Sequence, residues 1–184
     1  MNIFRSAVAP ALAISLASCA QASFQGTAMD EKRGAPLAIA QLADQNGTTI
    51  GTADIISMNG KPTVRLTFAN LKPGIHAWHL HSAGKCEAPA FSSAGGHLNP
   101  YAREHGQDNP KGKHLGDMPN VTVGADGRGS GEFALDIGSA ELSELLFDAD
   151  GTAMMLHADP DDYRSDPAGA AGPRIACGVL EKLQ

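Results

Sequence analysis

Short segments in which apolar and polar residues alternate, separated by turn residues, begin soon after Pro36. Leu37 to Leu42, Thr49 to Met58 and Thr63 to Phe68 show the two-residue period of half-buried strands. The sequence Asp44-Gln45-Asn46-Gly47 between the first two is typical of a turn, and Asn59-Gly60 is a strong hairpin signal. The pattern therefore predicts three antiparallel strands in succession.

The same pattern returns later in the chain. Further strands are predicted in the histidine-bearing segment that follows Gly74 and at residues 121–123, 131–137, 152–158 and 174–180, with one helical turn at 139–145. Two long segments, 82–117 and 159–173, lack such a period and are rich in Gly, Pro, Asn or Asp. About eight short strands without an internal repeat predict an all-β domain over residues 36–184, a Greek-key β-barrel or sandwich with two long functional loops.

The first 18 residues have the pattern of an export signal, with one positive charge and then a short apolar stretch that is too short to span a membrane. Leu16-Ala17-Ser18-Cys19 resembles the lipobox of bacterial lipoproteins, in which cleavage precedes a lipidated cysteine. Cleavage before Ser23, after Ala20-Gln21-Ala22, is the alternative. We favour lipidation because Cys19 has no other evident role, and residues 19–35 then form a flexible tether.

Charge and cysteine content narrow the possible partners and the compartment. The formal net charge of −6 argues against nucleic acid or an anionic membrane surface as a partner, so membrane contact is expected only through Cys19. If Cys19 carries lipid, Cys86 and Cys177 remain, and an oxidising compartment such as the periplasm would let them form a disulfide. Two separate buried thiols are the alternative.

The distribution of histidine points to a metal. Six of the seven histidines lie between residues 76 and 114, and His157 stands alone on a predicted strand. His79 and His81 are two residues apart on a strand, so both side chains point to the same face. His76 has the opposite parity to His79, and we expect it to be structural.

The ligand types suggest two sites. His97, His105, His114 and Asp117 offer three nitrogens and one oxygen, which would complete a tetrahedral zinc site. His79, His81 and His157, together with His97, would supply four nitrogens, a good set for Cu(II). Spacing alone establishes neither the shared ligand nor the identity of the second metal.

Long motifs in a fixed order make the chain similar to the bacterial secreted form of copper–zinc superoxide dismutase, from about Leu37 to Leu180. The motifs are His79-Leu80-His81, Gly84-Lys85-Cys86, Ser93-Ala94-Gly95-Gly96-His97-Leu98-Asn99-Pro100, His105-Gly106, His114-Leu115-Gly116-Asp117-Met118-Pro119-Asn120, Asp161-Asp162-Tyr163 and Gly172-Pro173-Arg174-Ile175-Ala176-Cys177-Gly178-Val179, with His157 between the last two groups.

The resemblance implies dismutation of superoxide to dioxygen and hydrogen peroxide, which would protect the cell envelope from oxidative damage. It implies one copper held by His79, His81, His97 and His157, and one zinc held by His97, His105, His114 and Asp117. It also implies that His97 bridges the metals and takes part in proton transfer, that Arg174 attracts superoxide, that Asp161 connects a copper ligand to a zinc ligand, and that Cys86 and Cys177 form a disulfide.

Some positions depart from the family pattern. Ala77-Trp78 replaces the commoner Gly-Phe, and Pro173 before Arg174 could change where the guanidinium points.

A domain that binds copper and zinc without turnover, and a structural zinc-only module, are the alternatives to an enzyme. The presence of all six histidine ligands, Asp117 and Arg174 favours the enzyme. Monomers and homodimers are both compatible with the sequence. Asp159, Asp162 and Asp166 are expected to be solvated or to cap loops.

Overall fold

The computed structural model describes residues 33–183. The expected signal segment, the lipidation site at Cys19, the alternative cleavage before Ser23 and most of the expected tether lie outside these residues.

Ten strands, one short α-helix and one 3-10 turn make up the described part of the chain. They are β1 (Arg33–Asp44), β2 (Thr49–Met58), β3 (Lys61–Phe68), β4 (Gly74–His76), β5 (Trp78–His81), η1 (Ser92–Ala94), β6 (Val121–Val123), β7 (Gly129–Ala134), α1 (Ser139–Leu146), β8 (Ala153–His157), β9 (Arg174–Val179) and β10 (Glu181–Lys182). No helix within residues 33–183 has the length and apolar character needed to cross a membrane.

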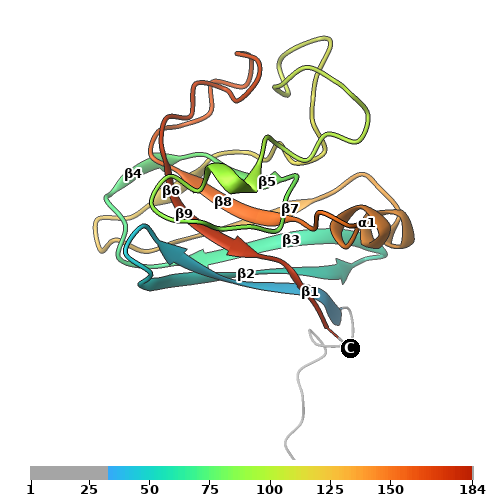
Figure 1. Cartoon of the computed structure of the whole chain (residues 1–184), viewed down its shortest axis with the longest axis horizontal. Coiled ribbons are helices and arrows are strands. Elements are labelled where there is room, and N and C mark those ends of the chain that lie inside the picture. The colour runs from blue at the N-terminus through green and yellow to red at the C-terminus, as the bar shows by residue number, and fades with distance from the viewer. Residues whose placement is uncertain (1–32, 184) are drawn as a thin grey trace, which may run out of the picture.

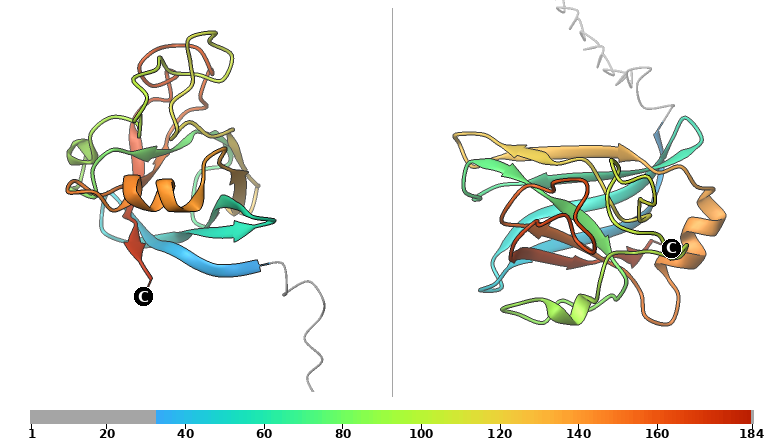
Figure 2. Two further views of the ribbon diagram at one scale, coloured as in Figure 1. Left: turned by 90° about the vertical axis from the view of Figure 1, so that its right-hand side faces the viewer. Right: turned by 90° about the horizontal axis from the view of Figure 1, so that it is seen from above.

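The strands form one curled antiparallel sheet in the order β5-β8-β9-β1-β2-β3-β7, with β10 beside β1, and a small second sheet of β4 and β6 (Figure 1). The prediction of an all-β barrel or sandwich is therefore confirmed. Two long loops project from the same end of the barrel, as Figure 1 and the left view of Figure 2 show. These loops are residues 82–117, which carry four of the seven residues expected to bind metal, and residues 159–173, which carry Asp161.

The histidine-bearing strand is divided at Ala77. β4 pairs with β6, whereas β5 pairs with β8, where His79 faces Met155 across the ladder. Ala77 itself donates from its backbone N–H to the carbonyl of Asp159 and accepts from the N–H of His157. The chain thus changes partner at this residue, which interrupts the single strand that the sequence predicted.

Among the other strands, β1 and β7 differ most from the predicted boundaries. β1 begins at Arg33, so residues 33–35 belong to the sheet and not to the tether. The register of β1 against β2 shifts on both sides of Pro36, which is consistent with a residue that has no N–H to donate. β7 occupies Gly129–Ala134 instead of 131–137, because the chain leaves the ladder with β3 after Ala134 and turns into α1.

The barrel core confirms the predicted alternation of β5. Trp78 and Leu80 are buried in the main apolar cluster, together with Leu142 and Leu146 of α1. The alternation of side chains along a strand then places His79 and His81 on the opposite face, toward the long loops. Both histidines are completely buried, so the loops cover them.

Candidate metal centre

Backbone hydrogen bonds attach the long loop to β5. The N–H of Leu98 donates to the carbonyl of Leu80 at 2.8 Å, and the N–H of Leu80 donates to the carbonyl of Gly116 at 3.0 Å. A Cβ atom on Gly116 would lie 2.4 Å from the Leu80 oxygen, so only glycine permits this approach. These contacts place His97 and Asp117, the neighbours of Leu98 and Gly116, beside the strand histidines.

Four buried histidines form the first group of potential metal ligands. Each of His79, His81, His97 and His157 offers a ring nitrogen that lies within 4.8 Å of the others. Four ring nitrogens of this group, Nδ1 of His79 and Nε2 of His81, His97 and His157, are buried without a hydrogen-bond partner among the described residues. Buried polar atoms rarely remain unpaired in native proteins, and a shared metal ion would satisfy all four at once.

The remaining ring nitrogens of three of these histidines are held by acceptors. Nδ1 of His81 donates to the Gly95 carbonyl at 3.0 Å, and Nδ1 of His157 to the Gly172 carbonyl at 3.3 Å. Nε2 of His79 donates to a carboxylate oxygen of Asp161 at 2.8 Å. Each acceptor fixes the tautomer, so the unprotonated nitrogen faces the centre of the group.

The second group surrounds one carboxylate oxygen. Nδ1 of His97, His105 and His114 lies 2.8, 3.0 and 3.2 Å from Oδ1 of Asp117. All four residues are buried, and three nitrogens with one oxygen are the donor set of a closed zinc site. The other oxygen of Asp117 accepts from the N–H groups of Gly106 and His114, which orients the carboxylate.

His97 belongs to both groups. Its Nδ1 faces Asp117 and its Nε2 faces the first group, so no ring nitrogen remains for an outside partner. Asp161 joins the groups by a second route, because its Oδ2 accepts from His79 and its Oδ1 from Nε2 of His105 at 2.9 Å. The two groups are therefore connected through one ring and through one carboxylate.

Burial and hydrogen bonding shift the pKa values of these histidines in opposite directions. Burial lowers the pKa of His81 to about 2, of His157 to about 3 and of His97 to about 4, so these imidazoles are neutral at pH 7. Burial also disfavours a proton on His105, but hydrogen bonds to Asp117 and Asp161 outweigh it and raise its pKa to about 9. Neutral imidazole is the form that binds a metal ion.

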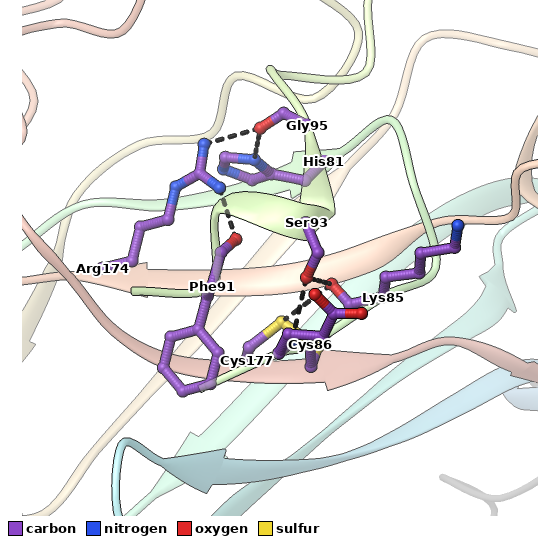
Figure 3. Close-up of a disulfide and its surroundings, with 9 residues drawn as sticks. His81, Lys85, Cys86, Phe91, Ser93, Gly95, Arg174 and Cys177 are labelled. Atoms are coloured by element: carbon purple, nitrogen blue, oxygen red, sulfur yellow. Dashed lines mark hydrogen bonds between the residues drawn. A yellow bond between two sulfur atoms is a disulfide. The ribbon is translucent and has the colours of Figure 1, made fainter. Parts of the chain in front are cut away.

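A cavity of about 450 Å³ connects the first group to the surface, with His81, His97, His157 and Arg174 in its wall. We call this cavity the channel. The guanidinium of Arg174 donates to the carbonyls of Phe91 and Gly95, at 2.5 and 2.6 Å (Figure 3). Pro173 therefore does not turn this cation away from the histidines.

The predicted disulfide between Cys86 and Cys177 is present. It attaches the segment that contains Phe91 and Gly95 to β9, the strand that begins with Arg174 (Figure 3). Since the Gly95 carbonyl accepts from both Arg174 and His81, the disulfide holds a segment that orients a cation and a candidate metal ligand.

Sequence reasoning missed two residues that support the centre. Asp166 was expected to be solvated or to cap its loop, but its Oδ1 accepts from the backbone N–H of His105 at 2.7 Å. The side chain of Asn120 binds the backbone of Asp161 twice, accepting from its N–H at 2.8 Å and donating to its carbonyl at 2.9 Å. Asn120 ends a motif that signalled the family, whereas no sequence signal distinguished Asp166.

His76 is structural, as expected. It is buried, its ring contacts the backbone carbonyls of His157 and Lys72 at 2.9 and 3.0 Å, and none of the donor groups found within residues 33–183 includes it. Asp162 caps its own loop, where it accepts from the N–H groups of Arg164 and Ser165.

A sequence model of copper/zinc superoxide dismutase (SODC) matches residues 49–180 of the chain. This protein belongs to the copper/zinc superoxide dismutase family. A copper–zinc superoxide dismutase of Aquifex aeolicus is 43% identical over 147 residues, which cover 77% of this chain and 86% of that protein.

Two solved structures extend the comparison of this superoxide dismutase with its relatives. A superoxide-dismutase-like protein from Bacillus subtilis superposes with a TM-score of 0.73 at 37% identity, covering 80% of this chain and 100% of that one. The Cu/Zn superoxide dismutase from Brucella abortus gives a TM-score of 0.63 at 27% identity, covering 78% and 98%. The family and the two histidine groups together identify an oxidoreductase that acts on superoxide and uses copper and zinc.

Proposed function

We propose that the first group binds copper, that the second binds zinc, and that His97 bridges the two ions. This assignment rests on the four buried ring nitrogens of the first group, which have no hydrogen-bond partner among residues 33–183. The second group is buried and has three nitrogens and one carboxylate oxygen, which suits a structural zinc ion. Three of the four histidines of the first group line the channel, which suits a metal that must meet substrate.

When bound, copper supplies the one-electron redox chemistry, and zinc contributes a fixed positive charge without redox activity. Arg174 supplies a cation in the wall of a narrow channel, where low dielectric strengthens its attraction for a small anion. This local field lets a protein with a net charge of −6 collect superoxide. The overall reaction converts two superoxide anions and two protons into dioxygen and hydrogen peroxide.

His97 is the residue suited to carry a proton at the channel wall. Its Nε2 faces the first group, and among residues 33–183 its ring finds no carbonyl acceptor of the kind that fixes the tautomers of His81 and His157. Nε2 of His97 can therefore accept or release a proton while Nδ1 stays beside Asp117.

We further propose that the enzyme acts in the bacterial periplasm, anchored by lipid on Cys19, and protects the cell envelope from superoxide. The support is the lipobox-like Leu16-Ala17-Ser18-Cys19 and the disulfide, since disulfides persist in oxidising compartments. Mass spectrometry of the mature N-terminus tests the anchor. A diacylglyceryl group on Cys19 is expected, and an unmodified terminus at Ser23 would exclude it.

Superoxide dismutation by the purified mature protein, with copper and zinc quantified on the same sample, tests the functional assignment. We expect rapid turnover with one copper and one zinc per chain. Full occupancy by both metals without turnover would contradict the proposed roles of Arg174 and His97. A chain that binds zinc alone would contradict the copper assignment.

A further inference from the structure

A second cavity, of about 400 Å³, adjoins the zinc-side group. Of the residues that line it, only His114 also lines the channel. Nδ1 of His114 faces Asp117, while its Nε2 donates to the carbonyl of Arg103, another residue of the cavity wall. The cavity therefore reaches one candidate zinc ligand, but the rest of its lining differs from that of the substrate channel. We call it the rear cavity.

Two cations line the rear cavity. Among residues 33–183, neither Arg103 nor Lys113 forms a salt bridge or a side-chain hydrogen bond, although the charges of Asp117 and Asp136 act on Lys113. Each instead lies over an aromatic ring: Nζ of Lys113 is 4.4 Å from the centre of Phe133, and the guanidinium carbon of Arg103 is 5.7 Å from the centre of Tyr101. The rings hold the two cations but leave their N–H donors available to a ligand.

Two carboxylates near the wall offset part of this charge. Asp136 lines the rear cavity and pairs with Lys61 at 3.0 Å, and Glu141 accepts from the hydroxyl of Tyr101 at 2.9 Å. Among the described lining residues, the two cations still outnumber the one carboxylate, in a protein whose net charge is −6. Such a local surplus attracts anions against the field of the whole molecule.

The rest of the wall is apolar. Leu115, Phe133, Ala134 and Leu135 line the rear cavity, and its volume falls within the range of about 300–1,000 Å³ that small-molecule sites occupy. Apolar walls with a few convergent polar groups favour a ligand that has an apolar body and one charged end. The planar fork of an arginine matches the two oxygens of a carboxylate, and an organic carboxylate supplies the apolar body as well.

We propose that the rear cavity binds a small organic carboxylate, with Arg103 and Lys113 at its charged end and the Phe133 and Leu115 side chains against its apolar body. This site is separate from superoxide turnover in the channel. The proposal does not depend on which metal occupies which group, because it rests on the cavity, its two cations and its apolar wall.

Binding of benzoate to the fully metallated protein, with copper reduced to its diamagnetic form, tests the proposal by nuclear magnetic resonance. We expect saturable shifts at the amides of Leu115, Phe133 and Ala134. Benzamide, which has the same shape without the charge, is expected to bind at least about tenfold more weakly, because it loses a charge-assisted hydrogen bond. Inorganic phosphate, which has no apolar body, is likewise expected to bind more weakly.

Matched variants locate the binding. The double substitution Arg103→Gln and Lys113→Met should abolish the shifts. The control is Lys111→Met, which removes a positive charge from the same loop at a lysine that pairs with Glu104. This control should preserve the shifts. Arg174→Met removes the competing cation of the channel and should also leave binding in the rear cavity unchanged. Metal content and the dispersion of the spectra report that each variant is folded.

Three results would overturn the proposal. The first is equal affinity for benzoate and benzamide, or for benzoate and phosphate. The second is full binding to the folded double variant. The third is a set of shifts confined to the channel residues Gly96, Ala168 and Gly172 and lost in Arg174→Met, since that would place the benzoate beside Arg174.

Discussion

The indole N–H of Trp78 donates a hydrogen bond to the backbone carbonyl of Pro119, at an Nε1–O distance of 2.5 Å. Trp78 directly precedes the candidate copper ligand His79, and Pro119 follows the candidate zinc ligand Asp117 by two residues. The bond therefore joins the segments that carry the two groups of metal ligands. It does so on the face of β5 that points into the barrel core. The phenylalanine that is commoner at this position could not make it.

Space for the larger ring comes from a glycine on β7. A Cβ atom on Gly131 would lie 2.9 Å from Cζ2 of Trp78 and 2.6 Å from Val121. We expect Gly131→Ala to lower the free energy of unfolding by about 1–3 kcal/mol through overpacking. Urea unfolding of the wild type, Gly131→Ala, Trp78→Phe and the double variant measures the coupling between the two positions. Gly131→Ala should reduce the free energy of unfolding by less in the Trp78→Phe background than in the wild type. An equal reduction in both backgrounds would contradict the steric fit.

The disulfide should stabilise the fold and orient the substrate cation. The bond joins cysteines separated by 91 positions, and the chain-entropy relation gives about 4–5 kcal/mol for a loop of that size. Replacing Cys86 and Cys177 with Ala should lower the free energy of unfolding by an amount of this order at matched metal content. It should also slow dismutation, because Phe91 and Gly95 then hold Arg174 less firmly. An unchanged unfolding midpoint and rate would refute both effects.

Arg174 should act through its charge. Replacing it with Ala removes the cation of the channel wall and should reduce the dismutation rate by about tenfold or more, with a weaker dependence on salt. Copper and zinc contents should stay unchanged. The matched control is Arg164→Ala, which removes the same charge from an exposed position in the loop that precedes β9. Equal losses in the two variants would show that net charge matters more than the position of Arg174.

Metal content distinguishes the two groups. His157 belongs only to the first, so His157→Ala should lose copper and retain zinc. His114 belongs only to the second, so His114→Ala should lose zinc preferentially. Elemental analysis after dialysis measures both, and one full equivalent of copper retained by His157→Ala would reject the ligand assignment.

Zinc binding should release a proton from His105. Its pKa of about 9 in the metal-free chain means that the ring is protonated at pH 7, and a metal must displace that proton. Zinc affinity should therefore rise with pH up to about 9. Calorimetry in two buffers with different ionisation enthalpies counts the protons released. Asp161→Asn removes one acceptor of His105 and should reduce that count, and release of no proton by the wild type at pH 7 would contradict the assignment.

The sequence by itself determined the strands, the ligand types and the family. Alternation in segments such as Thr63–Phe68 is a local property of a half-buried strand, and it needs no knowledge of the partner. The chemistry of imidazole and carboxylate restricts which metals each set can hold, and the long motifs from His79 to Asp117 carry the resemblance to copper/zinc superoxide dismutase.

Only the tertiary structure decided how those residues face one another. The loops at 82–117 and 159–173 have no period, so the direction of His97 and the position of Asp166 depend on docking against β5 and against each other. The histidine strand is divided at Ala77 because its first part pairs with β6 and its second part pairs with β8. Long-range contacts set these features, since the residues that meet are far apart in sequence and no local pattern encodes the pairing.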